Sequence, residues 1–354
     1  VYSTASAELF ATASIALLDS LNCVDYLCFG CETDSIDLLN TVAEILINEP
    51  KEYKDLLTIN LKTGISFPKA RAKALDEYFK KYNLDYSLDI NSKKYAKYPS
   101  DITSNSNLDI NTFINQPNNI LGIEYIKALM RFNSKINPVP LKRLGAGYHS
   151  LDTRTKLASA TGIRTAMANK DNISGLLPDN CLNIIKNHTT IEYNDFSTVL
   201  GSKLLSMDTL DHIEGINQDL SNRIANNKYN FTDIETFIPM LQSKNYTYSA
   251  ISRALLHIIL DIKTDDLKEF ISNNYVNYAM ILGFNKNTGV LSEISKSTKI
   301  PLVSKFATFY KEADYNQRKM LDINLKADNL YRMIYMNKTS ETLPTEFQRQ
   351  IIIK

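Results

Sequence analysis

The stretch best suited to binding a phosphate group lies between Lys142 and Lys170, where six basic residues face a single acid, Asp152. Within it, Ser159 and Thr161 precede Arg164 at the expected start of a helix. Free backbone N–H groups, hydroxyls and a bidentate guanidinium at a helix start suit a polyphosphate. Ser159, Thr161 and Arg164 are therefore candidate phosphate ligands. The same pattern is also typical of an ordinary helix N-cap followed by a solvated arginine.

Two further short segments carry groups that suit a nucleotide. Asn118 and Asn119 follow Pro117, and their amides could read the edge of a purine or a ribose, although the same residues would serve as a plain helix cap. Gly30 ends a short apolar run, Val24–Gly30. A glycine at the carboxyl end of a strand lets a ligand approach the backbone, where α/β proteins form ligand sites.

A third candidate site combines basic groups with aromatic rings in the second half of the chain. Lys244, Tyr246 and Tyr248 precede Arg253 and His257, which are four residues apart and share a helix face. Cations beside rings that can stack on bases suit single-stranded RNA. The alternative is a solvated helix face over an apolar core.

Other chemistries are disfavoured by the sequence. Cys28 and Cys31 have C-x-x-C spacing, but only Cys23 and Cys181 remain, too few for a second pair around zinc, so we expect small residues in a strand and no metal site. The P-loop, G-x-G-x-x-G and G-x-S-x-G motifs are absent. With 40 Lys and Arg against 39 Asp and Glu, the net charge is +1, so any nucleic-acid site must be a local patch.

The four cysteines and the lack of a long apolar run favour a cytoplasmic protein without membrane contact. A helix over 3–21, a buried strand over 24–30 and helices from Asp34 and over 51–92 predict an α/β fold with a parallel sheet. A loop is expected over 91–112, a helix over 117–131 and a strand over 139–144. Beyond Pro178 helical patterns dominate, at 216–225, 233–241, 250–262 and 317–334, with one strand expected over 278–283.

We therefore expect a nucleotide-binding α/β domain over 1–172, with a partial Rossmann-like parallel sheet, and a mainly helical domain over 173–354. The helical half offers the surface for a large partner.

Taken in order along the chain, these segments resemble the bacterial tRNA(Met) cytidine acetate ligases of the HIGH-type nucleotidylyltransferase superfamily. The stretches that carry the resemblance are Tyr2–Phe10, Cys28–Glu32, Pro117–Tyr125, Arg143, Tyr148–His149, Ala158–Arg164, Glu214–Ile216, Tyr246–His257 and Leu282–Asn285. The resemblance covers essentially the whole chain.

The resemblance implies an enzyme that activates acetate with ATP, releasing pyrophosphate, and passes the acetyl group to the wobble cytidine of elongator tRNA(Met). It implies that Gly30, Asn118 or Asn119, Arg143 and the backbone of Leu144 contact ATP, with Ser159–Arg164 as the phosphate-binding segment. Mg²⁺ is the expected companion of ATP, no protein nucleophile is needed, and DNA is not expected as a partner. The helical half, with Lys244, Tyr246, Tyr248, Arg253 and His257, would hold the tRNA.

The chain departs from the family in one respect: the Asn-Pro-Phe-His-x-Gly-His signature that cradles the ATP phosphates is not in it. We therefore expect it to lack part of the nucleotide-binding domain and not to activate acetate unaided. Two alternatives stay open at this point. One is a nucleotidylyltransferase for a small phosphorylated substrate, and the other is a non-catalytic tRNA-binding fragment.

Overall fold

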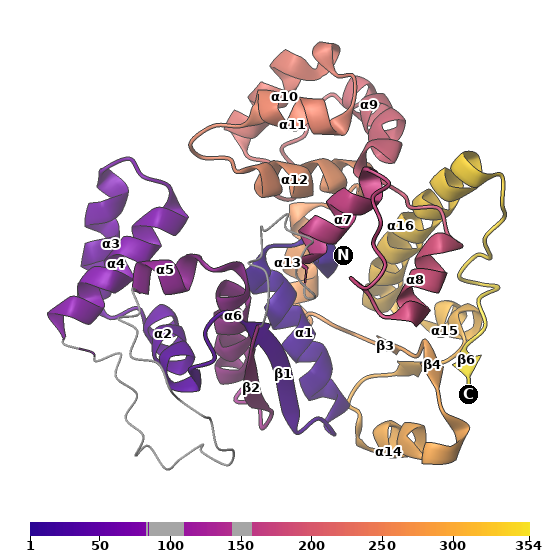
Figure 1. Cartoon of the computed structure of the whole chain (residues 1–354), viewed down its shortest axis with the longest axis horizontal. Coiled ribbons are helices and arrows are strands. Elements are labelled where there is room, and N and C mark those ends of the chain that lie inside the picture. The colour runs from indigo at the N-terminus through magenta and orange to yellow at the C-terminus, as the bar shows by residue number, and fades with distance from the viewer. Residues whose placement is uncertain (83, 85–109, 144–157) are drawn as a thin grey trace. The chain divides into compact units, whose positions relative to one another are not determined.

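The computed structural model describes residues 1–82, 84, 110–143 and 158–354 (Figure 1). The contacts divide the chain into two compact units. The smaller unit is Val24–Tyr148, and the larger unit joins Val1–Cys23 to His149–Lys354.

The smaller unit has a two-stranded parallel sheet with helices around it. Its elements are β1 (Tyr26–Cys31), α2 (Ile36–Asn48), α3 (Lys51–Lys62), α4 (Phe67–Lys81), α5 (Ile110–Asn115), α6 (Pro117–Arg131) and β2 (Asn137–Lys142). In the parallel register, Gly30 lies opposite Leu141 and Cys31 opposite Lys142. Figure 1 shows β1 and β2 side by side, with α6 next to them. The carboxyl ends of both strands therefore meet at one edge.

Local signals account for the start of these helices. Ser35 caps α2 by accepting a hydrogen bond from the Leu38 amide. Pro117 occupies the first turn of α6, where its missing N–H costs nothing. The apolar faces of α2, α4, α5 and α6 then pack with β1 in one core that includes Leu39, Phe113 and Ile123.

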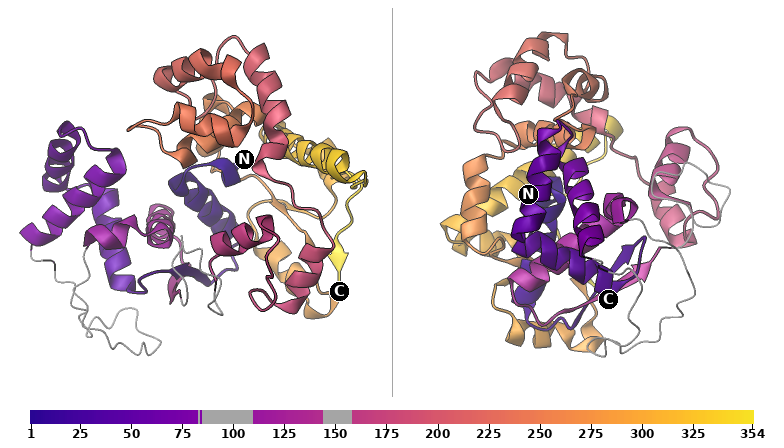
Figure 2. Two further views of the ribbon diagram at one scale, coloured as in Figure 1. Left: turned by 45° about the horizontal axis from the view of Figure 1, so that its top comes forward. Right: turned by 90° about the vertical axis from the view of Figure 1, so that its left-hand side faces the viewer.

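The larger unit is mainly helical. It contains α1 (Ala7–Leu21), α7 (Ala160–Ala168), α8 (Asp179–Lys186), α9 (Ser197–Ser206), α10 (Gln218–Asn227), α11 (Ile234–Leu241), α12 (Tyr248–Leu260), α13 (Thr264–Ser272), α14 (Val290–Ser297), α15 (Phe306–Glu312) and α16 (Tyr315–Thr339). Short 3₁₀ turns lie at Tyr2–Thr4, Tyr193–Phe196, Lys228–Asn230 and Lys286–Thr288. Helices α9–α12 form one group in every view of Figures 1 and 2, around a shared apolar core.

Two short parallel strand pairs complete this unit. They are β3 (Ala279–Met280) with β5 (Leu302–Val303), and β4 (Gly283–Phe284) with β6 (Ile352–Ile353). The strand expected over 278–283 is thus two strands, each of two residues. Strands of two residues carry almost no period-2 pattern, so the apolar run predicted a strand here but not its division into two.

The start of the chain packs within the larger unit. Val1, Tyr2 and Leu9 lie against the core cluster that contains Phe270 and Met320. The Tyr2 hydroxyl also donates a hydrogen bond to the carbonyl oxygen of Tyr275. The compact units therefore do not coincide with the boundary expected at 172, and the functional division there stays a prediction.

The structure confirms the predicted fold class, a parallel α/β part together with a mainly helical part. The prediction that β1 is a buried strand is wrong, because only Phe29 and Cys31 are buried in it. Most of the loop expected over 91–112 lies outside the described residues. In the described ranges, no helix is both long and apolar enough to cross a membrane.

Gly122 is a close-approach position between α6 and β1. A Cβ atom there would lie 2.6 Å from Cε2 of Phe29. The Phe29 ring is itself held against Tyr125, with ring centroids 5.7 Å apart.

We expect Gly122→Ala to destabilise the protein by about 1–3 kcal/mol through overpacking, although Ala is the better helix former by about 1 kcal/mol. Denaturant unfolding of the whole chain measures this change. Gly122→Ala should cost less in a Phe29→Leu background, because the smaller leucine side chain vacates the space that the ring fills. Equal costs in both backgrounds would mean that the contact does not limit packing.

Candidate functional site

The carboxyl edge of β1 and β2 brings Gly30 and Arg143 together. The Arg143 amide donates to the Cys31 carbonyl oxygen at 2.8 Å, which extends the ladder one residue beyond β2. A Cβ atom on Gly30 would lie 3.5 Å from Cγ of Arg143, so the stem of Arg143 passes beside Gly30. The Arg143 side chain is exposed. A bare backbone beside an exposed guanidinium leaves room and charge for an anion.

The next residue along the chain after β1, Glu32, joins this edge to the start of α6. Its carboxylate accepts one hydrogen bond from Nδ2 of Asn118, at 2.6 Å, and one from the Asn119 amide, at 3.0 Å. Oδ1 of Asn119 in turn accepts from the Glu32 and Thr33 amides, at 3.0 and 3.1 Å. We call this reciprocal set of bonds the Glu32–Asn119 clasp. It satisfies the first-turn amide of Asn119, since Gln116, the N-cap of α6, makes no side-chain capping bond.

Asn119 has no capacity left for a nucleotide. Its side chain is fully buried, and Nδ2 donates to the Phe113 carbonyl oxygen and to Oε1 of Gln116, at 3.0 and 2.7 Å. Both lone pairs of Oδ1 are used by the clasp. The expectation that Asn119 contacts ATP is therefore wrong for its side chain. Asn118 is half-buried and remains a candidate.

Ser159, Thr161 and Arg164 lie at the start of α7, in the larger unit. Ser159 is buried, and its Oγ accepts from the Gly162 amide at 2.9 Å, so it is the N-cap of α7. The Ser159 hydroxyl therefore acts as an ordinary helix N-cap, the alternative to phosphate binding given by the sequence. Thr161 is half-buried, and Arg164 is exposed with Nη2 3.4 Å from the Thr161 hydroxyl. Leu144 lies outside the described residues.

Lys244 and Tyr246 lie on the turn that leads into α12, and Tyr248 is the first residue of that helix. Lys244 is exposed, and so is Tyr248. Tyr246 packs against the core of α9–α12, and its hydroxyl donates to Oδ1 of Asn217, the N-cap of α10. Tyr248 is therefore the ring that is more accessible for stacking.

Arg253 and His257 differ although they share a face of α12. Arg253 is half-buried without a carboxylate partner among the described residues, and burial lowers its pKa. His257 is 4% exposed, with Nδ1 2.9 Å from the Glu214 carbonyl oxygen and Nε2 3.0 Å from Oγ1 of Thr4. The expectation that His257 faces RNA is wrong, because both ring nitrogens are occupied inside the larger unit.

The sequence pattern gave no role to Glu32, which the structure shows joining the end of β1 to the start of α6. The only signal was its position, an acid directly after a strand that ends in Gly-Cys. Its neighbour Cys31 is buried, and burial raises the pKa of its thiol to about 12, with the charges of Asp34 and Glu32 adding to the shift. Cys31 thus stays a neutral thiol, in agreement with the prediction of small residues in a strand.

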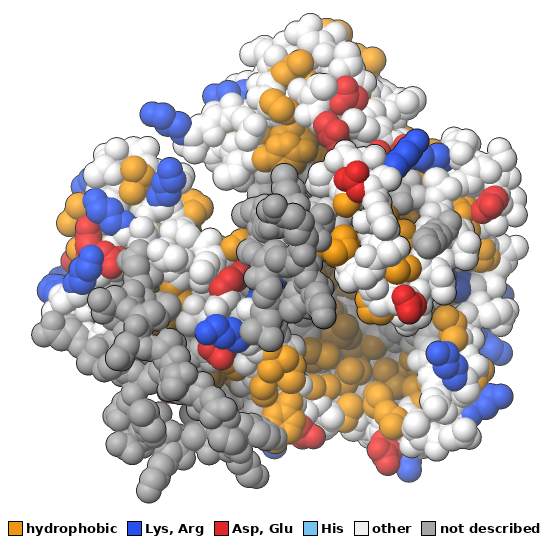
Figure 3. All heavy atoms as spheres, viewed as in Figure 1, with side chains coloured by type: hydrophobic (Ala, Val, Ile, Leu, Met, Phe, Trp, Pro, Cys, Tyr) orange, Lys and Arg blue, Asp and Glu red, His pale blue; other side chains and the backbone are white. Residues whose placement is uncertain are grey.

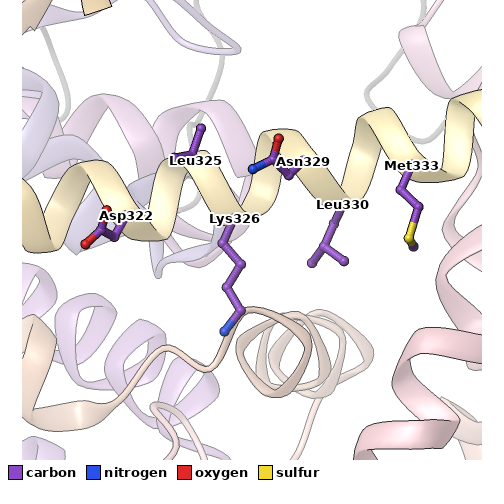
Figure 4. Close-up of a pocket in the computed structure, with 6 residues that line it drawn as sticks. All are labelled: Asp322, Leu325, Lys326, Asn329, Leu330 and Met333. Carbon is purple, nitrogen blue, oxygen red and sulfur yellow. The ribbon is translucent and has the colours of Figure 1, made fainter. Parts of the chain in front are cut away.

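The predicted residues that the structure describes belong to no metal cluster, and they do not line the pocket along α16. In the described part of the chain, no group of three His, Cys, Asp or Glu residues is placed to hold a metal ion. One open pocket runs along α16, lined by Asp322, Leu325, Lys326, Asn329, Leu330 and Met333, and contains none of the predicted residues (Figure 4). On the face shown in Figure 3, basic and acidic side chains are interspersed over the described parts of the surface.

Comparison with known proteins decides the family. The model of the HIGH Nucleotidyl Transferase family matches residues 1–346. The tRNA(Met) cytidine acetate ligase of Clostridium acetobutylicum is 33% identical over 360 residues, covering 100% of this chain and 82% of that protein. The chain belongs to the tRNA(Met) cytidine acetate ligase family. The ligase of Clostridium perfringens is 32% identical, over 94% of this chain and 78% of its own length.

Two solved structures share the fold of this family member. The apo crystal structure of Thermotoga maritima TmcAL superposes with a TM-score of 0.83, at 24% identity, over 98% of this chain and 81% of that one. The form of the same protein bound with alpha-thio ATP gives a TM-score of 0.80 at the same coverage. The family assignment and the parallel α/β architecture agree with a nucleotidyltransferase.

The buried His257 makes stability depend on pH. Burial lowers its pKa below the ordinary value of 6.5, against the opposing effect of the Glu214 carbonyl. As the pH falls below 6.5, the unfolded chain binds a proton before the folded chain does. The stability that neutral His257 contributes is thus present above about pH 6.5 and is lost as the pH falls through the folded-state pKa.

We expect the free energy of unfolding to fall less between about pH 7.5 and about pH 5 in His257→Asn than in the wild type. Asn keeps a donor for the Glu214 carbonyl but does not titrate. Denaturant unfolding at both pH values measures the difference. The exposed His188, replaced in the same way, is the matched surface control. If the free energy of unfolding of His257→Asn falls with pH as much as that of the wild type, the buried His257 is not the source of the pH dependence.

Proposed function

We propose that this protein is an ATP-dependent ligase that acetylates the wobble cytidine of elongator tRNA(Met), giving N(4)-acetylcytidine, in the cytoplasm. The observation that carries the proposal is the similarity to tRNA(Met) cytidine acetate ligases over nearly the whole chain. The edge that pairs Gly30 with Arg143 supports it, since an exposed guanidinium beside bare backbone suits a nucleotide phosphate.

The proposed reaction has two steps. A carboxylate oxygen of acetate attacks the α-phosphorus of ATP, the bond to the β-phosphate oxygen breaks, and pyrophosphate leaves. The exocyclic amine of cytidine then attacks the acetyl carbon, the bond to the AMP oxygen breaks, and the amine loses a proton to solvent. Both steps depend chiefly on positioning and on neutralising negative charge. An unpaired anticodon base is accessible without unfolding a duplex.

In the smaller unit, Arg143 is proposed to neutralise phosphate charge beside Gly30, where the backbone is open to the nucleotide. In the larger unit, Arg164 and the hydroxyl of Thr161 are proposed as phosphate ligands at the start of α7. The backbone of Leu144, outside the described residues, stays a proposed ATP contact. Asn118 contacts the nucleotide, while Asn119 and Ser159 hold backbone in place. No group of three His, Cys, Asp or Glu residues in the described ranges is placed to hold a metal ion, and Mg²⁺ would enter with the phosphates of ATP, which it binds through oxygen.

The tRNA surface is proposed within 173–354, and nucleotide binding within 1–172. Lys244, Tyr248 and Arg253 make up the proposed tRNA patch, with Tyr246 supporting the turn. Arg253 is the strongest candidate in this patch. It is a half-buried cation without a carboxylate partner among the described residues, and its burial raises the free energy of the protein until an anion binds.

Activity is tested by incubating the full-length protein with ATP, radiolabelled acetate and tRNA(Met). The proposal expects label in N(4)-acetylcytidine together with AMP and pyrophosphate. Formation of a different adenylated product without tRNA acetylation would favour a nucleotidylyltransferase for small substrates. Binding of tRNA without ATP turnover would favour a non-catalytic module.

Arg143→Ala and Arg164→Ala should each weaken ATP use by roughly 10- to 100-fold, because a hydrogen bond to a charged group contributes about 1.5–3 kcal/mol. Affinity for tRNA should change little. Initial rates at varied ATP concentration and a tRNA binding assay separate the two effects. Lys142→Ala removes an exposed cation one residue from Arg143 and serves as control. Loss of tRNA affinity with normal ATP use would place these arginines on the RNA surface.

Arg253→Ala should weaken tRNA binding and lower the slope of log affinity against log salt by about one unit. ATP affinity should stay unchanged. Arg223, which pairs with Asp219 on α10, is the matched control. If Arg253→Ala loses stability but binds tRNA with the wild-type salt slope, the side chain is structural.

A further inference from the structure

Glu32 fixes which way the amide of Asn118 points. A carboxylate only accepts hydrogen bonds, so the amide group 2.6 Å from Oε1 of Glu32 must be the NH₂ of Asn118. The other carboxylate oxygen is held by the Asn119 amide at 3.0 Å, which prevents Glu32 from turning away. Oδ1 of Asn118 therefore points away from Glu32 as a fixed acceptor.

This acceptor is available to a ligand. Asn118 is half-buried, and its Oδ1 has no hydrogen-bond partner among the described residues. It lies in the first turn of α6, held to the residue that follows Cys31, while Cys31 itself bonds to Arg143. The oriented amide and the exposed guanidinium thus flank the same carboxyl end of β1, where open α/β sheets bind their ligands.

A fixed acceptor discriminates between purines. Adenine carries a donor at its exocyclic N6, whereas guanine carries an acceptor, O6, at the corresponding position. Resting on the proposed use of ATP, we propose that Glu32 is a positioning residue that orients Asn118 to accept from the adenine N6 amine, and so makes the site prefer ATP to GTP. A correctly paired base contact discriminates by roughly 10- to 100-fold.

Glu32→Gln releases this constraint. The introduced glutamine has one oxygen and one NH₂, so while its oxygen accepts from the Asn119 amide, its NH₂ confronts the NH₂ of Asn118. The Asn118 amide must then flip and present a donor to the base. We expect Glu32→Gln to lower the ratio of ATP to GTP affinity by roughly tenfold or more.

The exchanged pair Glu32→Gln with Asn118→Asp restores both hydrogen bonds. The introduced glutamine accepts from the Asn119 amide and donates to the introduced aspartate, whose second oxygen is again an acceptor for the base. The double variant should therefore recover the preference for ATP and the stability that Glu32→Gln loses. Asn118→Asp alone sets two carboxylates against each other and should be the less stable single variant.

The test is titration calorimetry of MgATP and MgGTP with the full chain, alongside denaturant unfolding. Asp34→Asn removes an exposed charge two residues away and should leave the nucleotide ratio unchanged. A lower ratio in Glu32→Gln that the exchanged pair restores supports the proposal. If Glu32→Gln loses stability but keeps the ratio, or if the exchanged pair folds and stays unselective, the proposal is overturned.

Wild-type results separate this inference from the proposed function. A wild type that binds ATP and GTP equally overturns the role of Glu32 and leaves nucleotide binding intact. A wild type that binds neither nucleotide, while still binding tRNA, contradicts the ATP site itself, and the positioning role with it.

Discussion

The site in the smaller unit depends on a reciprocal set of hydrogen bonds between residues 86 or 87 positions apart in the chain. Glu32 caps the first turn of α6, and Asn119 of that turn accepts from the Glu32 and Thr33 amides. The Glu32 carboxylate accepts from the Asn119 amide, and the Asn119 side chain accepts from the Glu32 and Thr33 amides. Removing either side chain leaves buried polar atoms without a hydrogen bond, which destabilises the protein by about 1–3 kcal/mol for each atom. The Glu32–Asn119 clasp therefore fixes where β1 ends relative to where α6 begins.

The parallel register of β1 and β2 places Arg143 beside Gly30. Because Cys31 pairs opposite Lys142, the next amide, that of Arg143, reaches the Cys31 carbonyl and places its side chain beside Gly30. Asn118, oriented by Glu32, and Arg143, held by Cys31, are thus positioned by consecutive residues of one strand end. Buried Asn119 and Ser159 hold backbone, while the exposed arginines can meet phosphate. This separation of roles suits a reaction that needs positioning and charge more than a nucleophile.

Local signals explain what the sequence predicted well. Pro117 at the start of α6 and Asp233 as the N-cap of α11 act within one turn, and both helices begin where these residues predict. Burial depends instead on distant partners. The His257 ring is hydrogen-bonded to Thr4, 253 residues away, and the Asn119 side chain to Glu32 and Thr33. From their residue types both side chains were predicted to bind a ligand, but in the fold their hydrogen-bonding atoms are occupied by other residues of the chain. The two-residue strands β3–β6 exist only through pairing between distant segments.

Amide hydrogen exchange of the full chain tests the Glu32–Asn119 clasp most directly, since it reports the opening of each backbone hydrogen bond. The amides of Glu32, Thr33 and Asn119 are the ones to follow. If the clasp holds the strand end and the helix start together, these three amides exchange as slowly as amides in the middle of α6, and Asn119→Ala makes Glu32 and Thr33 exchange fast. Exchange of the wild-type Glu32 and Thr33 amides as fast as that of the exposed Lys244 would contradict it.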